Sequence, residues 1–489
     1  MQLSSTKEQI LQNSFLNQVD KTELENFWND LKLSEDDEGA QYLSVSISIP
    51  VVDVLAVLEQ SNSNDGFQYY WEKPNDDISF VAIGTLERIT AKGDQRFKLS
   101  SSRGKELLSR VHHFSGVKHR NADVHLFGGF SFFDDNPAQN WEPYNSASFT
   151  LPIWMIIREG ESCVLTFSIP VNQLTTFEDA FSLLLNKLGE IEHVCQAEQY
   201  RVAPETKLKV EVEVPAFGSK EHENWINSID IAKSKIQSGE FEKVVLAREL
   251  TFKLNREISA THILNRLRFQ YPDCYSFLIR QNSDSSFIGS TPERLASFNS
   301  QFVLTEGLAG STSRGKTASE DAVLEYELLH SKKDIKEHEI VRDAIEENLQ
   351  VYSNKISHPT SPKIKKLSNV QHLFTPITAI IKDGASKTEV LKTLHPTPAV
   401  GGFPREEAVS FIKNIENFDR GWYAAPIGWI NASGNGEFIV AIRSGLIKNN
   451  EVRFFAGCGI VEDSDPEKEW EETNLKFIPM ISALEYAGT

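Results

Sequence analysis

The sequence has few cysteines, and they lie far apart. The four are Cys163, Cys195, Cys274 and Cys458, and no CxxC spacing occurs among them. Closely and regularly spaced cysteines are typical of disulfide frameworks and of structural zinc sites. The sequence therefore argues against both, and we expect a reducing compartment.

Long apolar runs and an excess of basic residues are also lacking. No stretch approaches the ~20 apolar residues that cross a bilayer, and the N-terminus has no charged segment followed by an apolar run. Lys and Arg number 50 against 69 for Asp and Glu, which gives a net charge of −19. This balance argues against nucleic acid or an anionic membrane as the main partner. A cytoplasmic enzyme or binding protein is expected.

The chain does have ample material for a core. It has 489 residues, of which 40% are hydrophobic and 24% charged. After a helical lead-in of about 40 residues, β-like runs dominate, and beyond about residue 220 helices alternate with strands. Helices are predicted over 221–238, 259–270 and 361–369. The charged, Pro- and Gly-containing stretch 200–220 is the best boundary candidate. We therefore predict an α+β protein with antiparallel sheets, an N-terminal subdomain over 1–210 and a catalytic region over 211–489.

A long helix is predicted over 318–352, and Glu337 falls where that helix should be apolar. At about 100° per residue, Val323, Tyr326, Val341 and Ala344 form one stripe with Glu337 at its centre. An unpaired buried charge is costly, so Glu337 needs a cation, a ligand or a basic side chain. A simple pair with Lys or Arg across the core is an equally good interpretation.

The last predicted helix, from about residue 465, carries a second acidic cluster. Glu469, Glu472 and Lys476 share one of its faces. On its own this pattern is more often a solvated helix face. The preceding strand, however, contains Gly457 and Gly459, where a ligand could approach the backbone closely. A tight turn is the alternative explanation for these glycines.

Two carboxylates from different helices suit a hard divalent cation. Mg²⁺ binds one or two protein carboxylates and completes its shell with water and substrate oxygens, so an anionic, oxygen-rich substrate is predicted. Asp334 lies near the edge of the same stripe as Glu337. Other segments fit such a substrate, although each taken alone would usually be structural: the loop-like run with Gly310 and Ser311, the run from His395 through Ala399, and Arg443 inside a predicted strand over 438–446.

Two further residues are candidates for proton transfer. Lys243 begins a β-branched strand, and Glu293 follows Pro292 at the end of another. A desolvated lysine can act as a general base and a partly buried glutamate as a general acid. Spacing alone does not establish either role.

Taken together, these segments resemble the chorismate-utilising enzymes, which include anthranilate, aminodeoxychorismate, salicylate and isochorismate synthases. The similarity rests on ordered motifs over about 240 residues, so chance is a poor explanation. The motifs are GEFEKVVLAR at 239–248, STPER at 290–294, LAGS at 308–311, EH at 337–338, LHPTP at 394–398, FAGCGIV at 455–461 and EWEET at 469–473. Upstream, YWEKP at 70–74 and FGGFSF at 127–132 resemble the N-terminal half of isochorismate synthases.

The resemblance implies one large fold, with two facing antiparallel sheets and helices outside, so the boundary near residue 210 becomes a subdomain seam. It implies Mg²⁺ as cofactor, with Glu337 and Glu472 as ligands and Asp334 and Glu469 as neighbouring acids that hold metal-bound water. It also implies that the two substrate carboxylates are bound by six residues: Gly310, Ser311, Arg443, Gly457, Gly459 and Lys476. His395 and Ala399 are further substrate-binding candidates.

Lys243 decides which member of the family the chain resembles. Ammonia-using relatives carry glutamine at this place, whereas water-using relatives carry lysine. Lys243 would deprotonate a water that adds at C2 of chorismate, and Glu293 would protonate the departing C4 hydroxyl. The product would be isochorismate, for menaquinone, a siderophore or salicylate, and these uses cannot be told apart from the residues.

Other functions stay open at this stage. Salicylate synthases share the residues matching Lys243 and Glu293 but eliminate pyruvate; they tend to carry Thr where Ala399 stands. A catalytically inactive chorismate-binding relative is the second alternative, and a metal-binding structural protein the weakest. We expect no amidotransferase subunit, because Gln at position 243 and an LLES-like run are absent from the sequence. A monomer is preferred over a dimer.

Overall fold

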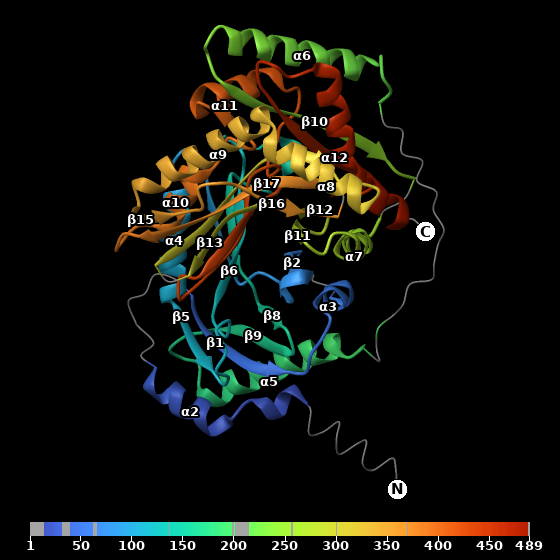
Figure 1. Cartoon of the computed structure of the whole chain (residues 1–489). Helices are drawn as coiled ribbons and strands as arrows, with labels where there is room; N and C mark the ends of the chain where they lie inside the picture. Colours follow the sequence, from blue (N-terminus) through green and yellow to red (C-terminus); the bar gives the residue numbers. More distant parts are fainter. Residues whose placement is uncertain are drawn as a thin grey trace.

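The computed structural model describes residues 14–31, 40–61, 66–135, 137–197, 200, 215–255, 258–299, 301–368 and 370–487. Two large sheets form its framework, and helices lie around them (Figure 1). The predicted fold class is confirmed. No helix among the described ranges is long and apolar enough to cross a membrane.

The larger sheet has 12 strands, and every neighbouring pair is antiparallel except β1 with β5. In spatial order the strands are β18 (Gly402–Phe403), β10 (Lys243–Lys253), β22 (Glu451–Ile460), β21 (Ser444–Lys448), β12 (Ser285–Thr291), β11 (Tyr275–Asn282), β2 (Gln68–Lys73), β3 (Ile78–Ile83), β8 (Trp154–Glu159), β9 (Ser162–Val171), β1 (Gln41–Ile49) and β5 (Val111–Ser115).

The second sheet has 10 strands. Nine follow one another in the order β15 (Ser353–Ser357), β17 (Val370–Ile381), β14 (Phe302–Ser313), β13 (Arg294–Asn299), β20 (Gly436–Val440), β19 (Pro426–Asn431), β6 (His125–Phe130), β7 (Ala147–Leu151) and β4 (Glu87–Ala91), and β16 (Lys363–Lys366) pairs with β17.

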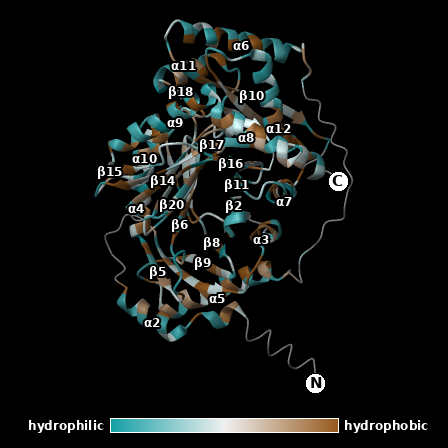
Figure 2. Ribbon diagram, in the orientation of Figure 1, coloured by the Kyte–Doolittle hydropathy of each residue, from teal (hydrophilic) through white to brown (hydrophobic). Residues whose placement is uncertain are grey.

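The helices of the described ranges are amphipathic and cover the sheets (Figure 1). Hydrophilic and hydrophobic residues alternate along them, as helices with one face on a sheet require (Figure 2). They are α2 (Lys21–Asp30), α3 (Val54–Gln60), α4 (Arg96–Ser109), α5 (Phe177–Cys195), α6 (Lys220–Gln237), α7 (Ala260–Gln270), α8 (Ala318–His330), α9 (Lys332–Gln350), α10 (Lys387–Leu394), α11 (Arg405–Ile415) and α12 (Pro466–Ala487), with short 3₁₀ turns at Phe15–Gln18, Pro74–Asp76 and Gln139–Trp141.

Side-chain alternation along the strands builds two hydrophobic clusters. In β3, Phe80 and Ala82 belong to one cluster, whereas Val81 and Ile83 belong to the other. Successive residues of a strand point to opposite faces. The larger sheet is therefore buried on both faces at β3, which explains why this strand is a nearly continuous apolar run.

Residue 210 lies outside the described residues, but strands on either side of it can be compared. β2 pairs with β11 in the larger sheet, and β6 pairs with β19 in the smaller one. Each sheet therefore joins strands from both predicted regions, so the predicted seam does not separate one sheet from the other.

The predicted helix over 318–352 is two helices. The chain turns at Ser331, which has extended backbone (φ −71°, ψ 113°) and caps α9 by accepting a hydrogen bond from Asp334 N. Val323 and Tyr326 are 55% and 63% exposed, so the predicted apolar stripe across both halves is wrong. In α9 the buried face instead contains His338 and Val341, with Glu337 beside it.

Two other local predictions are corrected. The segment 361–369 was predicted to be helical, but it contains strand β16, which pairs with β17. The predicted strand over 438–446 is two strands, β20 and β21, which belong to different sheets. Arg443 lies in the link between them with φ +49°. It is therefore at a crossing point between the sheets, where its side chain faces a cavity.

Candidate active site

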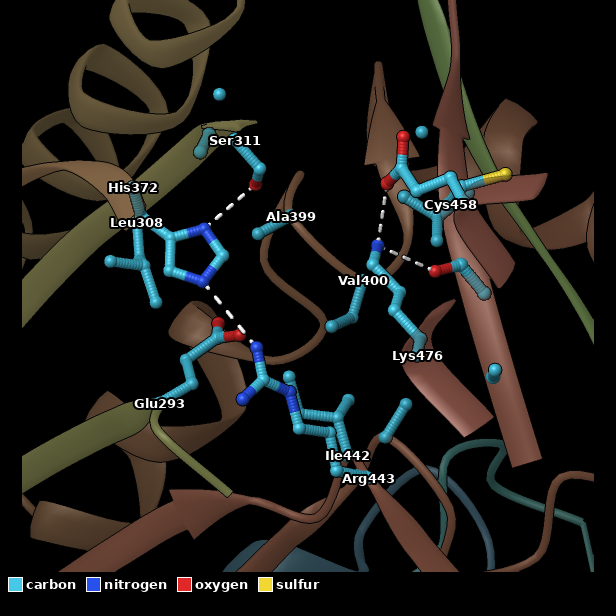
Figure 3. Close-up of a pocket in the computed structure, with 18 of the residues that line it drawn as sticks. Glu293, Leu308, Ser311, His372, Ala399, Val400, Ile442, Arg443, Cys458 and Lys476 are labelled. Carbon is cyan, nitrogen blue, oxygen red and sulfur yellow. Dashed lines mark hydrogen bonds and ion pairs between the residues drawn. The ribbon is translucent and has the colours of Figure 1, made fainter. Parts of the chain in front are cut away.

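A cavity of about 200 Å³ brings most of the predicted site residues together (Figure 3). It lies among β10, β22, β14, the β20–β21 link, and helices α9 and α12. Twelve of the predicted residues line it: Glu293, Gly310, Ser311, Asp334, Glu337, Ala399, Arg443, Gly457, Gly459, Glu469, Glu472 and Lys476.

Lys243 and Glu337 form an ion pair next to this cavity. Lys243 is the first residue of β10 and is 1% exposed, and its Nζ lies 2.7 Å from Glu337 Oε1. Burial alone would raise the pKa of Glu337, but the charge and hydrogen bond of Lys243 outweigh burial and lower it. The structure therefore confirms the alternative interpretation of Glu337, in which it pairs with a basic side chain.

Gly459 leaves the space that Lys243 occupies. A Cβ at position 459 would lie 2.8 Å from Lys243 Cε and 3.2 Å from Glu337 Oε1. Such approaches are closer than ordinary van der Waals contact. Gly459 therefore allows the Lys243 side chain to reach Glu337. It lies within strand β22, so a tight turn does not explain this glycine.

Lys476 of α12 is held by two oxygen atoms. Its Nζ lies 2.7 Å from Glu472 Oε1 and donates a 2.8 Å hydrogen bond to the carbonyl of Gly457. Burial would lower the pKa of Lys476, but the Glu472 carboxylate raises it above its ordinary value. Lys476 is therefore a fixed cation at the cavity.

Among the described residues, no Lys or Arg forms an ion pair with Glu469. It is 5% exposed, and burial together with the Glu472 carboxylate raises its pKa. One helical turn of α12 thus brings two carboxylates to the same cavity. Asp334, from the first turn of α9, faces the cavity too and accepts a hydrogen bond from Ser331 Oγ.

Glu293 lies between strands β12 and β13 and is 5% exposed. Burial and the nearby Glu306 carboxylate raise its pKa from 4.5 to about 7. Glu306 is itself paired with Lys365 at 2.9 Å. Near neutral pH a substantial fraction of Glu293 is protonated, so it can donate a proton to a group in the cavity.

His372 is a functional candidate that the sequence interpretation missed. It lies on β17 between Ser311 and Arg443 (Figure 3), with Nδ1 2.7 Å from Ser311 Oγ and Nε2 3.5 Å from Arg443 Nη2. Burial and the Arg443 guanidinium hold the pKa of His372 well below its ordinary value. Because a guanidinium only donates, Nε2 accepts and Nδ1–H donates to Ser311.

His372 therefore joins two substrate-binding candidates into one chain of hydrogen bonds. Its strand, Val370–Ile381, was not recognised from the sequence. A histidine inside a largely apolar run is the signal that could have found it. Tyr423 was missed as well; its hydroxyl would lie 3.2 Å from a Cβ at Gly457.

Two predicted residues do not line the cavity. Lys243 lies behind Glu337, which it contacts. His395 is 5% exposed, its Nε2 lies 3.3 Å from the Phe132 carbonyl, and its ring packs edge-on against Phe132. The structure gives His395 a packing role, and direct substrate contact by it is not supported.

The acidic side chains fit a hard cation in their chemistry. All four predicted acids line one cavity, and a bound cation would favour the ionised form of Glu469, whose pKa burial raises. Among the described residues, however, no three His, Cys, Asp or Glu side chains are already gathered around one point. Glu337 and Glu472 are engaged by lysines, so binding of a cation would have to compete with Lys243 and Lys476.

Comparisons with known proteins found relatives that match nearly the whole chain. Isochorismate synthase MenF of Bacillus subtilis (strain 168) is 34% identical over 452 residues, which cover 91% of this chain and 94% of that protein. The salicylate biosynthesis isochorismate synthase of Pseudomonas aeruginosa is 35% identical over 451 residues, which cover 91% of this chain and 90% of that protein.

The fold has a counterpart among solved structures. MenF, the menaquinone-specific isochorismate synthase from Escherichia coli, matches with a TM-score of 0.75 at 25% identity, covering 95% of this chain and 99% of that one. The family described as chorismate binding enzyme matches residues 26–485, which is nearly the whole chain. The chain therefore belongs to the chorismate-binding enzyme family.

Proposed function

We propose that this protein is an isochorismate synthase that converts chorismate reversibly into isochorismate with Mg²⁺ as cofactor. The observation that carries the proposal is the state of Glu293. A carboxyl group with a pKa of about 7 lines the same cavity as the cations Arg443 and Lys476. A proton donor beside two cations suits the removal of a hydroxyl group from a dianionic substrate.

The two cations supply binding. Chorismate carries two carboxylates, and Lys476 approaches the cavity from the side opposite to His372 and Glu293 (Figure 3). His372 contacts both Ser311 and Arg443 and so helps to position the Arg443 guanidinium. Gly310 and Gly457, which have no side chains, allow the substrate to approach the backbone closely. The substrate is thereby oriented before reaction, which lowers the entropic part of the barrier.

The chemical step exchanges one hydroxyl group for another. A water oxygen bonds to C2 of the ring while Lys243 Nζ accepts its proton, the ring double bonds shift, and the C4–O bond breaks. Glu293 gives its proton to the departing oxygen, which leaves as water. One water enters and one leaves, so the net change is an isomerisation.

Glu337 and Glu472 would hold Mg²⁺, and Asp334 and Glu469 would support it. When bound, the cation would stabilise negative charge on the ring carboxylate. To bind the cation, Glu337 must give up its ion pair with Lys243. An uncharged Lys243 would release Glu337 more readily, and it is also the form of lysine that can accept a proton.

The test incubates the purified protein with chorismate and Mg²⁺ in heavy-oxygen water and separates the products by HPLC with mass detection. Isochorismate that carries one heavy oxygen, without pyruvate, is expected. Salicylate with pyruvate would favour the salicylate synthase alternative, for which no structural observation speaks. Bound chorismate without any product would assign the cavity to binding alone.

We also propose that the protein works in the cytoplasm as a monomer without an amidotransferase subunit. Its four cysteines are free and buried, as in a reducing compartment. Lys243 in place of glutamine supports the use of water.

A further inference from the structure

A second cavity, of about 210 Å³, lies between α4, α10 and the ten-stranded sheet. The two helices pack against each other beside that sheet (Figure 1). Among the described residues, none that lines this cavity also lines the candidate active site. It is therefore a separate space, and neither the family resemblance nor the proposed reaction gives it a role.

The floor of this second cavity is apolar. An apolar cavity of about 150 Å³ can hold a benzene molecule, so the larger volume here suits an aromatic ring with substituents or two fused rings. The floor is formed by Leu108, Leu126, Phe149, Ile430 and Phe438.

Asn431 contributes an unpaired donor to this apolar space. The residue is 2% exposed, and its Oδ1 accepts a 2.8 Å hydrogen bond from the backbone N–H of Asn435. This contact fixes the amide orientation. The other end, Nδ2, is buried, and no group in the described ranges forms a hydrogen bond with it. An unpaired buried donor is destabilising, so an acceptor from a ligand would be favoured there.

Ser100 of α4 is a second buried polar group without a partner. It is 6% exposed, and its Oγ makes no hydrogen bond. A helical serine usually bonds back to the preceding turn or points to water. Within the described part of the chain Ser100 does neither, and it lines the cavity together with Asn431.

Lys387 supplies a cation. It lies at the start of α10, lines the cavity, and donates one hydrogen bond to the carbonyl of Gly434. An ammonium has three N–H donors, so two remain. Burial lowers the pKa of Lys387 without an opposing carboxylate. Lys105 also lines the cavity, and the lining within the described chain includes no Asp or Glu.

We infer that this cavity binds a small aromatic carboxylate, with its ring on the apolar floor and its carboxylate bonded to Lys387, Asn431 or Ser100. A neutral hydrocarbon would leave the buried donors unpaired, and an inorganic anion would gain nothing from the apolar floor. A cationic ligand would meet two lysines and no carboxylate. This inference does not depend on the proposed function.

The test is calorimetric titration of the full-length protein with 2-naphthoate in EDTA, which removes divalent cations that could draw the probe to the active site. We expect one binding site per chain. A charge-assisted hydrogen bond contributes about 1.5–3 kcal/mol, so Lys387→Met should weaken binding about tenfold or more. Neutral 2-naphthalenemethanol should also bind about tenfold more weakly than the carboxylate.

Two control variants separate this cavity from other sites. Lys392→Met removes a lysine of the same helix that pairs with Asp94 outside the cavity, and Lys476→Met removes the cation of the candidate active site. Both should leave naphthoate affinity unchanged, whereas Ser100→Ala should lower it. Absence of binding to the wild-type protein, or binding lost only in Lys476→Met, would overturn the inference.

Discussion

The ammonium of Lys243 lies 2.7 Å from the carboxylate of Glu337, so the candidate base contacts a candidate magnesium ligand. The two residues are 94 positions apart in the sequence. The proposed base must be uncharged to accept a proton, and the Glu337 carboxylate must be available to bind a cation. Breaking the Lys243–Glu337 ion pair would therefore free Glu337 for the cation and Lys243 for proton transfer.

Replacing Lys243 tests the proposed base. Lys243→Met keeps most of the chain length but removes the amine, and isochorismate formation should fall by about 10²–10⁴-fold, the usual contribution of general base catalysis. Turnover is measured by HPLC. Lys235→Met is the matched control, because Lys235 forms an exposed pair with Glu240, and it should keep full activity. Wild-type turnover by Lys243→Met would eliminate the lysine as base.

Magnesium should compete with the same contact. We expect calorimetry to show Mg²⁺ binding that is weakened in Glu337→Gln and Glu472→Gln but strengthened in Lys243→Met, where Glu337 no longer has a competing partner. EDTA should abolish turnover, and added Mg²⁺ should restore it. The exposed neighbour Glu471 gives the control variant Glu471→Gln. Equal Mg²⁺ affinity in all four variants would place the cation elsewhere.

Gly459 should be needed for turnover because it leaves space for the Lys243 side chain. In Gly459→Ala the new methyl group would lie 2.8 Å from Lys243 Cε, so the lysine must move. A displacement of this kind can reduce turnover by about 10²-fold, and we expect kcat to fall more than KM changes. Gly189→Ala, in α5, meets no atom within 4 Å and should leave activity intact. Normal kcat in Gly459→Ala would show that the position of Lys243 is not restricted.

Glu293 should give both activity and stability a pH dependence. Its proton is needed for departure of the C4 hydroxyl, so kcat in the forward direction should decline as pH rises through about 7, the folded-state pKa. Glu293→Gln keeps the shape but cannot transfer a proton, so its turnover should be about 10²–10⁴-fold lower than that of wild type below pH 7 and should lack this decline with pH.

The stability effect has a defined sign. The folded-state pKa of Glu293 is about 7 and the ordinary value is 4.5, so the folded protein holds a proton that the unfolded chain releases between these values. The free energy of unfolding should therefore fall as pH rises from 4.5 to about 7 through this residue, by on the order of 3 kcal/mol. Urea unfolding of wild type and Glu293→Gln measures it: the variant should gain relative stability over this interval. A constant difference would mean that Glu293 is ionised throughout.

The strong local patterns in the sequence predicted much of this protein. Helix α6 was predicted over 221–238 and occupies Lys220–Gln237, and α7 was predicted over 259–270 and occupies Ala260–Gln270. Their amphipathic patterns are decided by residues three or four positions apart, which the sequence displays directly. Twelve of the fourteen site residues predicted from the sequence likewise line one cavity.

The sequence by itself thus determined the fold class, the family and the types of side chain at the site. Only the tertiary structure decided that Glu337 pairs with Lys243, that His372 connects Ser311 to Arg443, and that His395 packs against Phe132. These contacts join residues far apart in the chain, and they depend on how two sheets and the helices beside them pack. The position of Arg443 was also decided by the tertiary structure. It lies in the break between β20 and β21, and this break exists because the two strands pair in different sheets. That pairing depends on strands distant in sequence and not on the residues next to Arg443.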